Sequence, residues 1–189
     1  MNRLKILLFL LAVFVTGSAR GQDQLTLDPE VCKWFLNTDG SCVQCSISMC
    51  GTWQNEPRAS TLLFDSVYGN KVRGGSYPSR VEAYSNKRGI PIYNVTGSET
   101  IDWIKWASKT GRMSAIGFFS NHFQTALYYN PDGKDPKPWK IRNNWPGTLD
   151  NAQEYTEAEF VRLHNASGRW VVIIDRPPPP YKPTYIKWW

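Results

Sequence analysis

The spacing of apolar residues changes near the middle of this 189-residue chain, and that change restricts the fold more than any other feature. Before about residue 110, apolar positions recur at helical spacing, between prolines and glycines that begin and end helices. Beyond it, short β-branched and aromatic runs are separated by turn sequences such as residues 130–133. Helices followed by strands are typical of an α+β domain. We therefore predict N-terminal helices packed on a C-terminal, mostly antiparallel sheet.

Individual elements follow from the same signals. We expect helices at residues 28–35, 41–54, 57–68, 78–89, 98–109 and 156–164. We expect strands at residues 90–93, 114–119, 122–129, 139–142 and 169–175. The strand at 90–93 contains a proline, which cannot donate to a ladder, so it should lie at a sheet edge. Most of the nine tryptophans are expected in the core, and His164 is expected on the surface at a helix end.

The first 21 residues have the pattern of a secretory signal peptide. Arg3 and Lys5 precede an uninterrupted apolar run of 10 residues at 6–15, which is too short to span a bilayer. Small residues for cleavage follow at 17–21, and an uncleaved membrane anchor is the alternative. We therefore expect a secreted or periplasmic protein that leaves the membrane after signal cleavage.

We expect residues 22–176 to form a single domain, because they have the length of one, and a Pro- and Trp-rich tail follows at 177–189. Four consecutive prolines make the start of that tail extended polyproline II. Without the three basic residues of the signal segment, 19 Lys and Arg remain against 16 acidic residues, and none form a run of five. This scattered charge gives no indication of nucleic-acid binding.

Four cysteines lie within 19 residues, at Cys32, Cys42, Cys45 and Cys50. In an exported chain this number suggests an oxidising compartment. Three of the four share one expected helix, so we favour one disulfide plus a reactive thiol, with two disulfides as the alternative. We expect no metal site, because a single helix cannot supply a tetrahedral set of cysteine ligands.

Cys42 follows a Gly-Ser pair at the expected start of the helix at 41–54. Unpaired backbone N–H groups and the positive end of the helix dipole favour a thiolate at such a position. A base is available in His122, which begins an alternating strand, and the amide pair Asn143-Asn144 follows the strand at 139–142. The layout lets thiol and imidazole meet where the helices pack on the sheet.

Three segments resemble, in the same chain order, the motifs of papain-like cysteine peptidases. Residues 41–46, S-C-V-Q-C-S, resemble the nucleophile segment S-C-W-A-F-S. Residues 122–127, H-F-Q-T-A-L, resemble the histidine strand. Residues 139–147, W-K-I-R-N-N-W-P-G, are similar to W-x-I-K-N-S-W-G. The resemblance implies a compact, bacterial- or phage-type papain-like fold over about residues 37–175.

The resemblance also implies a role for each residue at a matching position. Cys42 would be the nucleophile, His122 the base and acid, Asn143 the amide that orients the ring, and Trp145 the side chain that shields it. The glutamine that completes the family's oxyanion hole is replaced by leucine, and the adjacent Asn37 is our candidate for that role. The implied reaction is cofactor-free hydrolysis of an amide bond in a peptide or protein substrate, through an acyl-enzyme.

Two other registers remain open. Gln44 lies six residues before Cys50, which would then be the nucleophile. Alternatively, residues 40–45, G-S-C-V-Q-C, align with the family's G-S-C-G-S-C, which would make Cys45 the nucleophile and Cys42 a disulfide partner. Two rival functions also remain: a thiol–disulfide oxidoreductase using the C-V-Q-C sequence, and a catalytically inactive papain-like binding domain.

Overall fold

The structure, a computed structural model, describes residues 35–38, 40–65, 67–68, 76–131, 134–147 and 152–176. The signal peptide expected at 1–21, Cys32 and the tail at 177–189 lie outside these residues, as does the helix expected at 28–35 apart from its last residue. Within the described part, no helix combines the length and apolar character that crossing a membrane requires.

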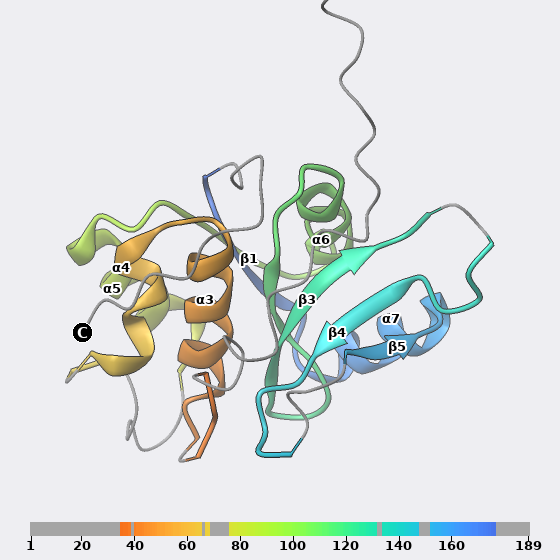
Figure 1. The fold of residues 1–189 in the computed structure, drawn as a ribbon, viewed down its shortest axis with the longest axis horizontal. Helices are drawn as coiled ribbons and strands as arrows, with labels where there is room; N and C mark the ends of the chain where they lie inside the picture. Colours follow the sequence, from red (N-terminus) through yellow and green to blue (C-terminus); the bar gives the residue numbers. More distant parts are fainter. Residues whose placement is uncertain are drawn as a thin grey trace, which may run out of the picture.

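A six-stranded antiparallel sheet with the order β1-β6-β2-β3-β4-β5 forms the centre of the fold (Figure 1). Its strands are β1 (Ile92–Thr96), β2 (Ser114–Gly117), β3 (Phe123–Tyr129), β4 (Trp139–Arg142), β5 (Gln153–Tyr155) and β6 (Trp170–Ile174). The helices are α3 (Cys42–Trp53), α4 (Pro57–Ser60), η2 (Leu62–Phe64), α5 (Pro78–Arg88), α6 (Thr100–Lys109) and α7 (Glu157–Ala166). The α+β class is thus confirmed. The strand expected at 90–93 is β1, which begins after Pro91 and does lie at an edge.

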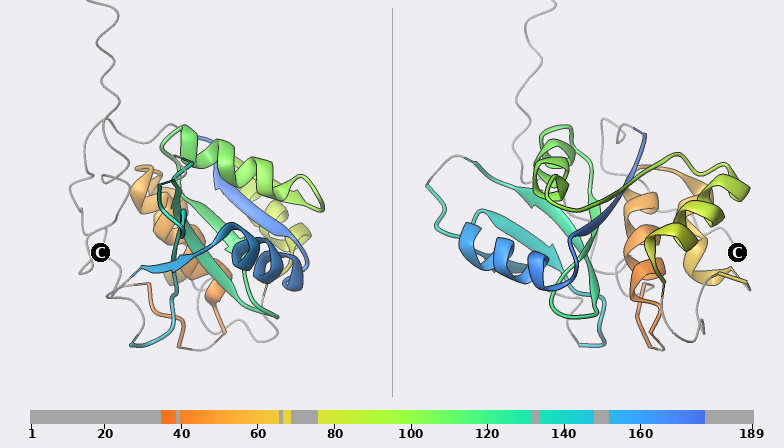
Figure 2. Two further views of the ribbon diagram at one scale, coloured as in Figure 1. Left: turned by 90° about the vertical axis from the view of Figure 1, so that its right-hand side faces the viewer. Right: turned by 180° about the vertical axis from the view of Figure 1, so that it is seen from behind.

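Helices cover both faces of the sheet. One face packs against α3 and α5, with α4 lying against α3, and the other face packs against α6 and α7 (Figure 2). Neighbouring strand residues alternate between the two buried clusters: Leu127 and Val172 belong to the α3 side, whereas Ala126 and Val171 belong to the α6 side. Both faces of the central strands are therefore buried, which is why these strands are apolar at consecutive positions.

Helix α3 is the innermost helix, and 10 of its 12 residues are buried. Its contact with α4 is close at Gly51, where a Cβ atom would lie 2.5 Å from Ser60 N and 2.6 Å from Ala59 Cβ. Any larger residue at this position would force the two helices apart. This close approach explains a glycine within the last turn of a buried helix, where glycine otherwise costs stability.

The end of β6 is fastened to the C-terminal end of α3. The side-chain amide of Gln54 donates hydrogen bonds to Ile174 O and Arg176 O. The buried carboxylate of Glu56 accepts the guanidinium groups of Arg58 and Arg176. These charge-assisted bonds hold the last described residues of the chain beside the end of the helix that is opposite Cys42.

Two expected helix signals are confirmed in detail, and one expected helix is too long. Gly89 ends α5 in the left-handed conformation at φ 63°, and Thr156 with Glu159 forms a capping box at the start of α7. The helix expected at 57–68 ends by Phe64, and Val67 is exposed. The cause is local: two hydroxyl groups, of Ser60 and Thr61, compete for the carbonyl of Pro57.

His164 is fully buried, so its expected surface position is wrong. Its Nδ1 donates to Gly117 O at 2.8 Å, and its Nε2 lies 2.8 Å from Thr100 Oγ1. The polar sequence of α7 gives no sign of this burial, because it depends on hydrogen bonds from the histidine to β2 and α6. Strand β5 was also not expected, since Gln153–Tyr155 has no apolar alternation and is defined only by pairing with β4.

Candidate active site

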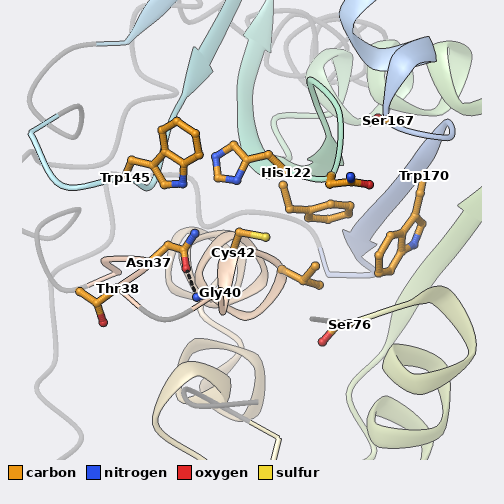
Figure 3. A pocket seen from close by; sticks show the side chains of 12 residues that line it. Asn37, Thr38, Gly40, Cys42, Ser76, His122, Trp145, Ser167 and Trp170 are labelled. Carbon is orange, nitrogen blue, oxygen red and sulfur yellow. Dashed lines mark hydrogen bonds between the residues drawn. The ribbon is translucent and has the colours of Figure 1, made fainter. Parts of the chain in front are cut away.

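A cavity of about 740 Å³ opens where the start of α3 meets the sheet (Figure 3). We call it the Cys42 pocket. Its lining comes from five parts of the chain and consists of Asn37, Thr38, Gly40, Cys42, Val43, Ser76, Asn121, His122, Phe123, Trp145, Ser167 and Trp170. None of these side chains is acidic or permanently cationic, so the pocket is polar without a fixed charge. Four of the expected site residues, Cys42, His122, Trp145 and Asn37, therefore share one cavity.

Cys42 is the first residue of α3, as the Gly-Ser turn indicates, and its thiol is partly exposed to the pocket. Burial raises the pKa of this thiol, and backbone hydrogen bonds involving Phe123, Val43 and Cys42 itself lower it by less. The sequence predicts a thiol made acidic by the helix start. In the folded protein, desolvation by the sheet outweighs that effect, so the resting side chain is a neutral thiol.

His122 lies in the turn between β2 and β3, directly before β3. Its backbone O accepts the N–H of Phe118, and the preceding Asn121 has a left-handed φ of 59°. Asparagine tolerates this conformation better than most residues. The turn thus presents the imidazole at the mouth of the Cys42 pocket rather than within the sheet (Figure 3).

Asn143 fixes the tautomer of the His122 ring. Asn143 Oδ1 accepts the backbone N–H of Trp145 at 3.2 Å and lies 2.9 Å from His122 Nε2. Because an amide oxygen only accepts, Nε2 carries the hydrogen, and Nδ1 of the neutral ring keeps a lone pair. Figure 3 shows the second ring nitrogen on the side of the ring that faces Asn37 and Cys42. Burial lowers the pKa of His122, although the Asn143 bond partly opposes this, so the ring is a proton acceptor at neutral pH.

Trp145 covers the imidazole from outside. The ring centres of Trp145 and His122 are 4.6 Å apart with a 34° angle between the planes, and Trp145 itself is 51% exposed. Such a large exposed aromatic side chain stabilises little by its own burial. What the structure shows is its ring packed beside the His122 ring at the edge of the Cys42 pocket.

Asn37 is held so that its amide nitrogen faces the pocket. Asn37 Oδ1 accepts the backbone N–H of Gly40 at 3.0 Å, and Asn37 N donates to Asn144 O at 2.8 Å. The oxygen is thereby turned toward the loop, and the NH₂ group points up toward His122 and Cys42 in Figure 3. The amide nitrogen is therefore a hydrogen-bond donor on the pocket side of the loop.

Asn144 is a site residue that sequence reasoning missed. Its side-chain nitrogen lies 3.0 Å from Cys42 O, 3.0 Å from Phe123 O and 3.1 Å from Ser46 Oγ, and the residue is fully buried. This single amide joins the start of α3 to the start of β3. Side chains of adjacent residues in extended chain point to opposite sides, so Asn143 reaches His122 while Asn144 reaches the helix.

The two alternative nucleophiles lie away from the pocket. Cys45 and Cys50 are fully buried, and neither lines the Cys42 pocket. Cys45 Sγ lies 3.8 Å from Ser41 Oγ, and burial strongly raises the pKa of Cys50. No disulfide joins any two of Cys42, Cys45 and Cys50, so the expected disulfide does not form among these three.

Comparison of the chain with models of known protein families and with curated protein sequences found no match.

Proposed function

We propose that this protein is a secreted, papain-like cysteine peptidase, a thiol-dependent hydrolase of amide bonds in peptides or proteins. The observation that carries the proposal is the convergence of Cys42 and His122 on one cavity, with the His122 ring tied to Asn143 at 2.9 Å. These residues come from three distant segments, and their order along the chain is the one that the resemblance to papain-like peptidases implies. The reaction requires no cofactor.

The first half of the proposed reaction forms an acyl-enzyme. Neutral His122 Nδ1 accepts the thiol proton of Cys42 as the sulfur attacks the carbonyl carbon of the substrate. The negative charge that develops on the carbonyl oxygen is stabilised by the Asn37 amide and by backbone N–H groups at the start of α3. The tetrahedral intermediate then breaks its C–N bond, and His122 returns the proton to the leaving amine.

The second half hydrolyses the thioester. His122, neutral again, takes a proton from water as the water oxygen attacks the acyl carbon. The C–S bond then breaks, and the proton returns to the sulfur. The products are a carboxylic acid and an amine, formed from one amide and one water. During each step the Asn143 side chain accepts a hydrogen bond from His122 Nε2 and so holds the ring in place. Because the amide is neutral, it adds no negative charge that would keep the transferred proton on the ring.

A peptidyl electrophile, such as a peptide vinyl sulfone, tests the proposal, with the modified cysteine located by mass spectrometry. Cys42 should be labelled first, and His122→Ala should slow labelling by roughly 100-fold or more, because a positioned general base contributes roughly 10²–10⁴. Asn37→Ala should cost roughly 3 kcal/mol in the barrier of substrate hydrolysis. Cys45→Ser is the matched control and should leave the labelling rate unchanged.

The rival functions predict different results. An inactive binding domain would label slowly at every described cysteine, with no dependence on His122. A thiol–disulfide oxidoreductase would require Cys45 as well as Cys42, and Cys45→Ser would then abolish activity. Labelling of Cys45 or Cys50 ahead of Cys42 would reject the assigned nucleophile.

A further inference from the structure

A second cavity, of about 580 Å³, lies between α6 and the edge strand β1, on the sheet face opposite α3. We call it the aromatic cavity, and Figure 1 labels both elements that form it. Its lining consists of Tyr93 on β1, Trp103 and Trp106 on α6, and the carboxylates of Glu99 and Asp102. The proposed hydrolase does not use any of these residues, because the Cys42 pocket lies on the helix α3 side.

Two of the three ring pairs of the aromatic cavity meet at steep angles, and the third is tilted at 38°. Tyr93 and Trp106 have ring centres 5.5 Å apart and planes at 90°, and Trp103 and Trp106 have centres 5.5 Å apart and planes at 77°. Tyr93 and Trp103 are 4.9 Å apart. All three are only half-buried, in contrast to the core tryptophans Trp53, Trp139 and Trp170. The three rings thus line one cavity and remain partly exposed.

The charges around the aromatic cavity favour a cationic occupant. Glu99 and Asp102 are exposed on the first turns of α6 and line the cavity. Arg112 lies with its guanidinium carbon 4.8 Å from the Trp106 ring centre but does not line the cavity. Trp106 thus already accepts one cation outside the cavity. The two charged residues that line the cavity, Glu99 and Asp102, are both acidic.

We propose that the aromatic cavity binds a quaternary ammonium group. The faces of tryptophan and tyrosine attract a cation through their negative quadrupoles. A primary ammonium has three N–H donors, and the ring faces offer them no strong acceptor, so they would have to turn to the carboxylates of Glu99 and Asp102 and away from the rings. A quaternary ammonium has no N–H group and can present its methyl groups to the rings. The carboxylates of Glu99 and Asp102 supply the opposing charge at the open side.

The probes are choline and its neutral isostere 3,3-dimethylbutan-1-ol, each titrated into the full chain by calorimetry. Choline should bind roughly 10-fold or more tightly than the isostere, since the two differ mainly in charge. Trp103→Leu and Asp102→Asn should each weaken choline binding by roughly 5-fold or more. Tyr77→Leu and Glu82→Gln are matched controls and should leave binding unchanged. Both residues are exposed on or beside α5, which packs on the opposite face of the sheet from α6. Circular dichroism establishes that each variant is folded.

Equal binding of choline and the isostere, absence of choline binding by the folded wild-type chain, or binding that survives in both cavity variants would overturn the proposal. Vesicles distinguish the source of the ammonium group. Retention on phosphatidylcholine vesicles, lost with Trp103→Leu and not seen on phosphatidylglycerol vesicles, would identify a lipid headgroup. Binding of choline without vesicle retention would identify a free solute.

Discussion

Replacing Asn144 by alanine removes the amide that joins α3 to β3. The lost nitrogen lies 3.0 Å from Cys42 O and Phe123 O and 3.1 Å from Ser46 Oγ, and its two hydrogens can satisfy two of these acceptors well at one time. Two net hydrogen bonds contribute about 1–3 kcal/mol, and the buried oxygens left without a donor add a desolvation cost. We therefore expect the free energy of unfolding to fall by about 2–4 kcal/mol.

Urea denaturation followed by tryptophan fluorescence measures this loss. Asn144→Asp should be less stable than Asn144→Ala, because its carboxylate would face three oxygen atoms in a buried site. Asn86→Ala, an exposed asparagine on α5, is the matched control and should stay within about 0.5 kcal/mol of wild type. Labelling of Cys42 by the peptidyl electrophile should slow in Asn144→Ala even in the absence of denaturant, because the thiol and the imidazole are no longer braced together. Wild-type stability in Asn144→Ala, or in Asn144→Asp, would refute the proposed role of the Asn144 amide in joining α3 to β3.

Three further predictions concern packing and protonation. Gly51→Ala should destabilise by about 1–3 kcal/mol in the same denaturation assay, because its Cβ would meet α4 backbone at 2.5 Å; an unchanged midpoint would contradict that contact. Trp145→Ala should expose the His122 ring and raise its depressed pKa toward 6.5, so the acid limb of the pH profile of Cys42 labelling should move to higher pH. The free energy of unfolding should change by less than about 1 kcal/mol. NMR titration of the His122 ring tests the direction of the pKa shift. Burial lowers the pKa of both His122 and His164 in the folded protein. As the pH falls through 6.5, the unfolded chain therefore binds protons before the folded protein does. The free energy of unfolding should decrease between about pH 7 and pH 5, before the carboxylates titrate. His164→Asn should flatten that slope, and an unchanged slope would show that His164 does not titrate on unfolding.

The parts of the fold that the sequence predicts well are those with local signals. The Gly-Ser turn before Cys42 indicates where α3 begins, and the capping box indicates where α7 begins. The aromatic and β-branched residues of β3 and the continuous apolar run of β6 indicate strands, and both strands are buried on both faces. Such signals require only a few consecutive residues, so they can be recognised without knowledge of the tertiary structure.

The remaining features depend on contacts between distant segments. Asn144 meets Cys42 across 102 positions of sequence, and no periodicity marks an amide for that role. His164 is buried because it bonds to β2 and α6, although its own helix is polar. The sign of the Cys42 pKa shift was wrong for the same reason, since the helix start can be recognised locally but the desolvating sheet cannot. The pairing that defines β5 is likewise non-local.

The bonds from Gln54 and Glu56 to Arg176 have a practical consequence for experiments on this protein. Helix α3 has 12 residues, so Cys42 and Gln54 are separated by about 18 Å of helix at 1.5 Å per residue. A label or immobilisation tag joined after Arg176 therefore departs from the end of the molecule that is farthest along α3 from the thiol. Surface capture through that end should leave the mouth of the cavity open to macromolecular reagents.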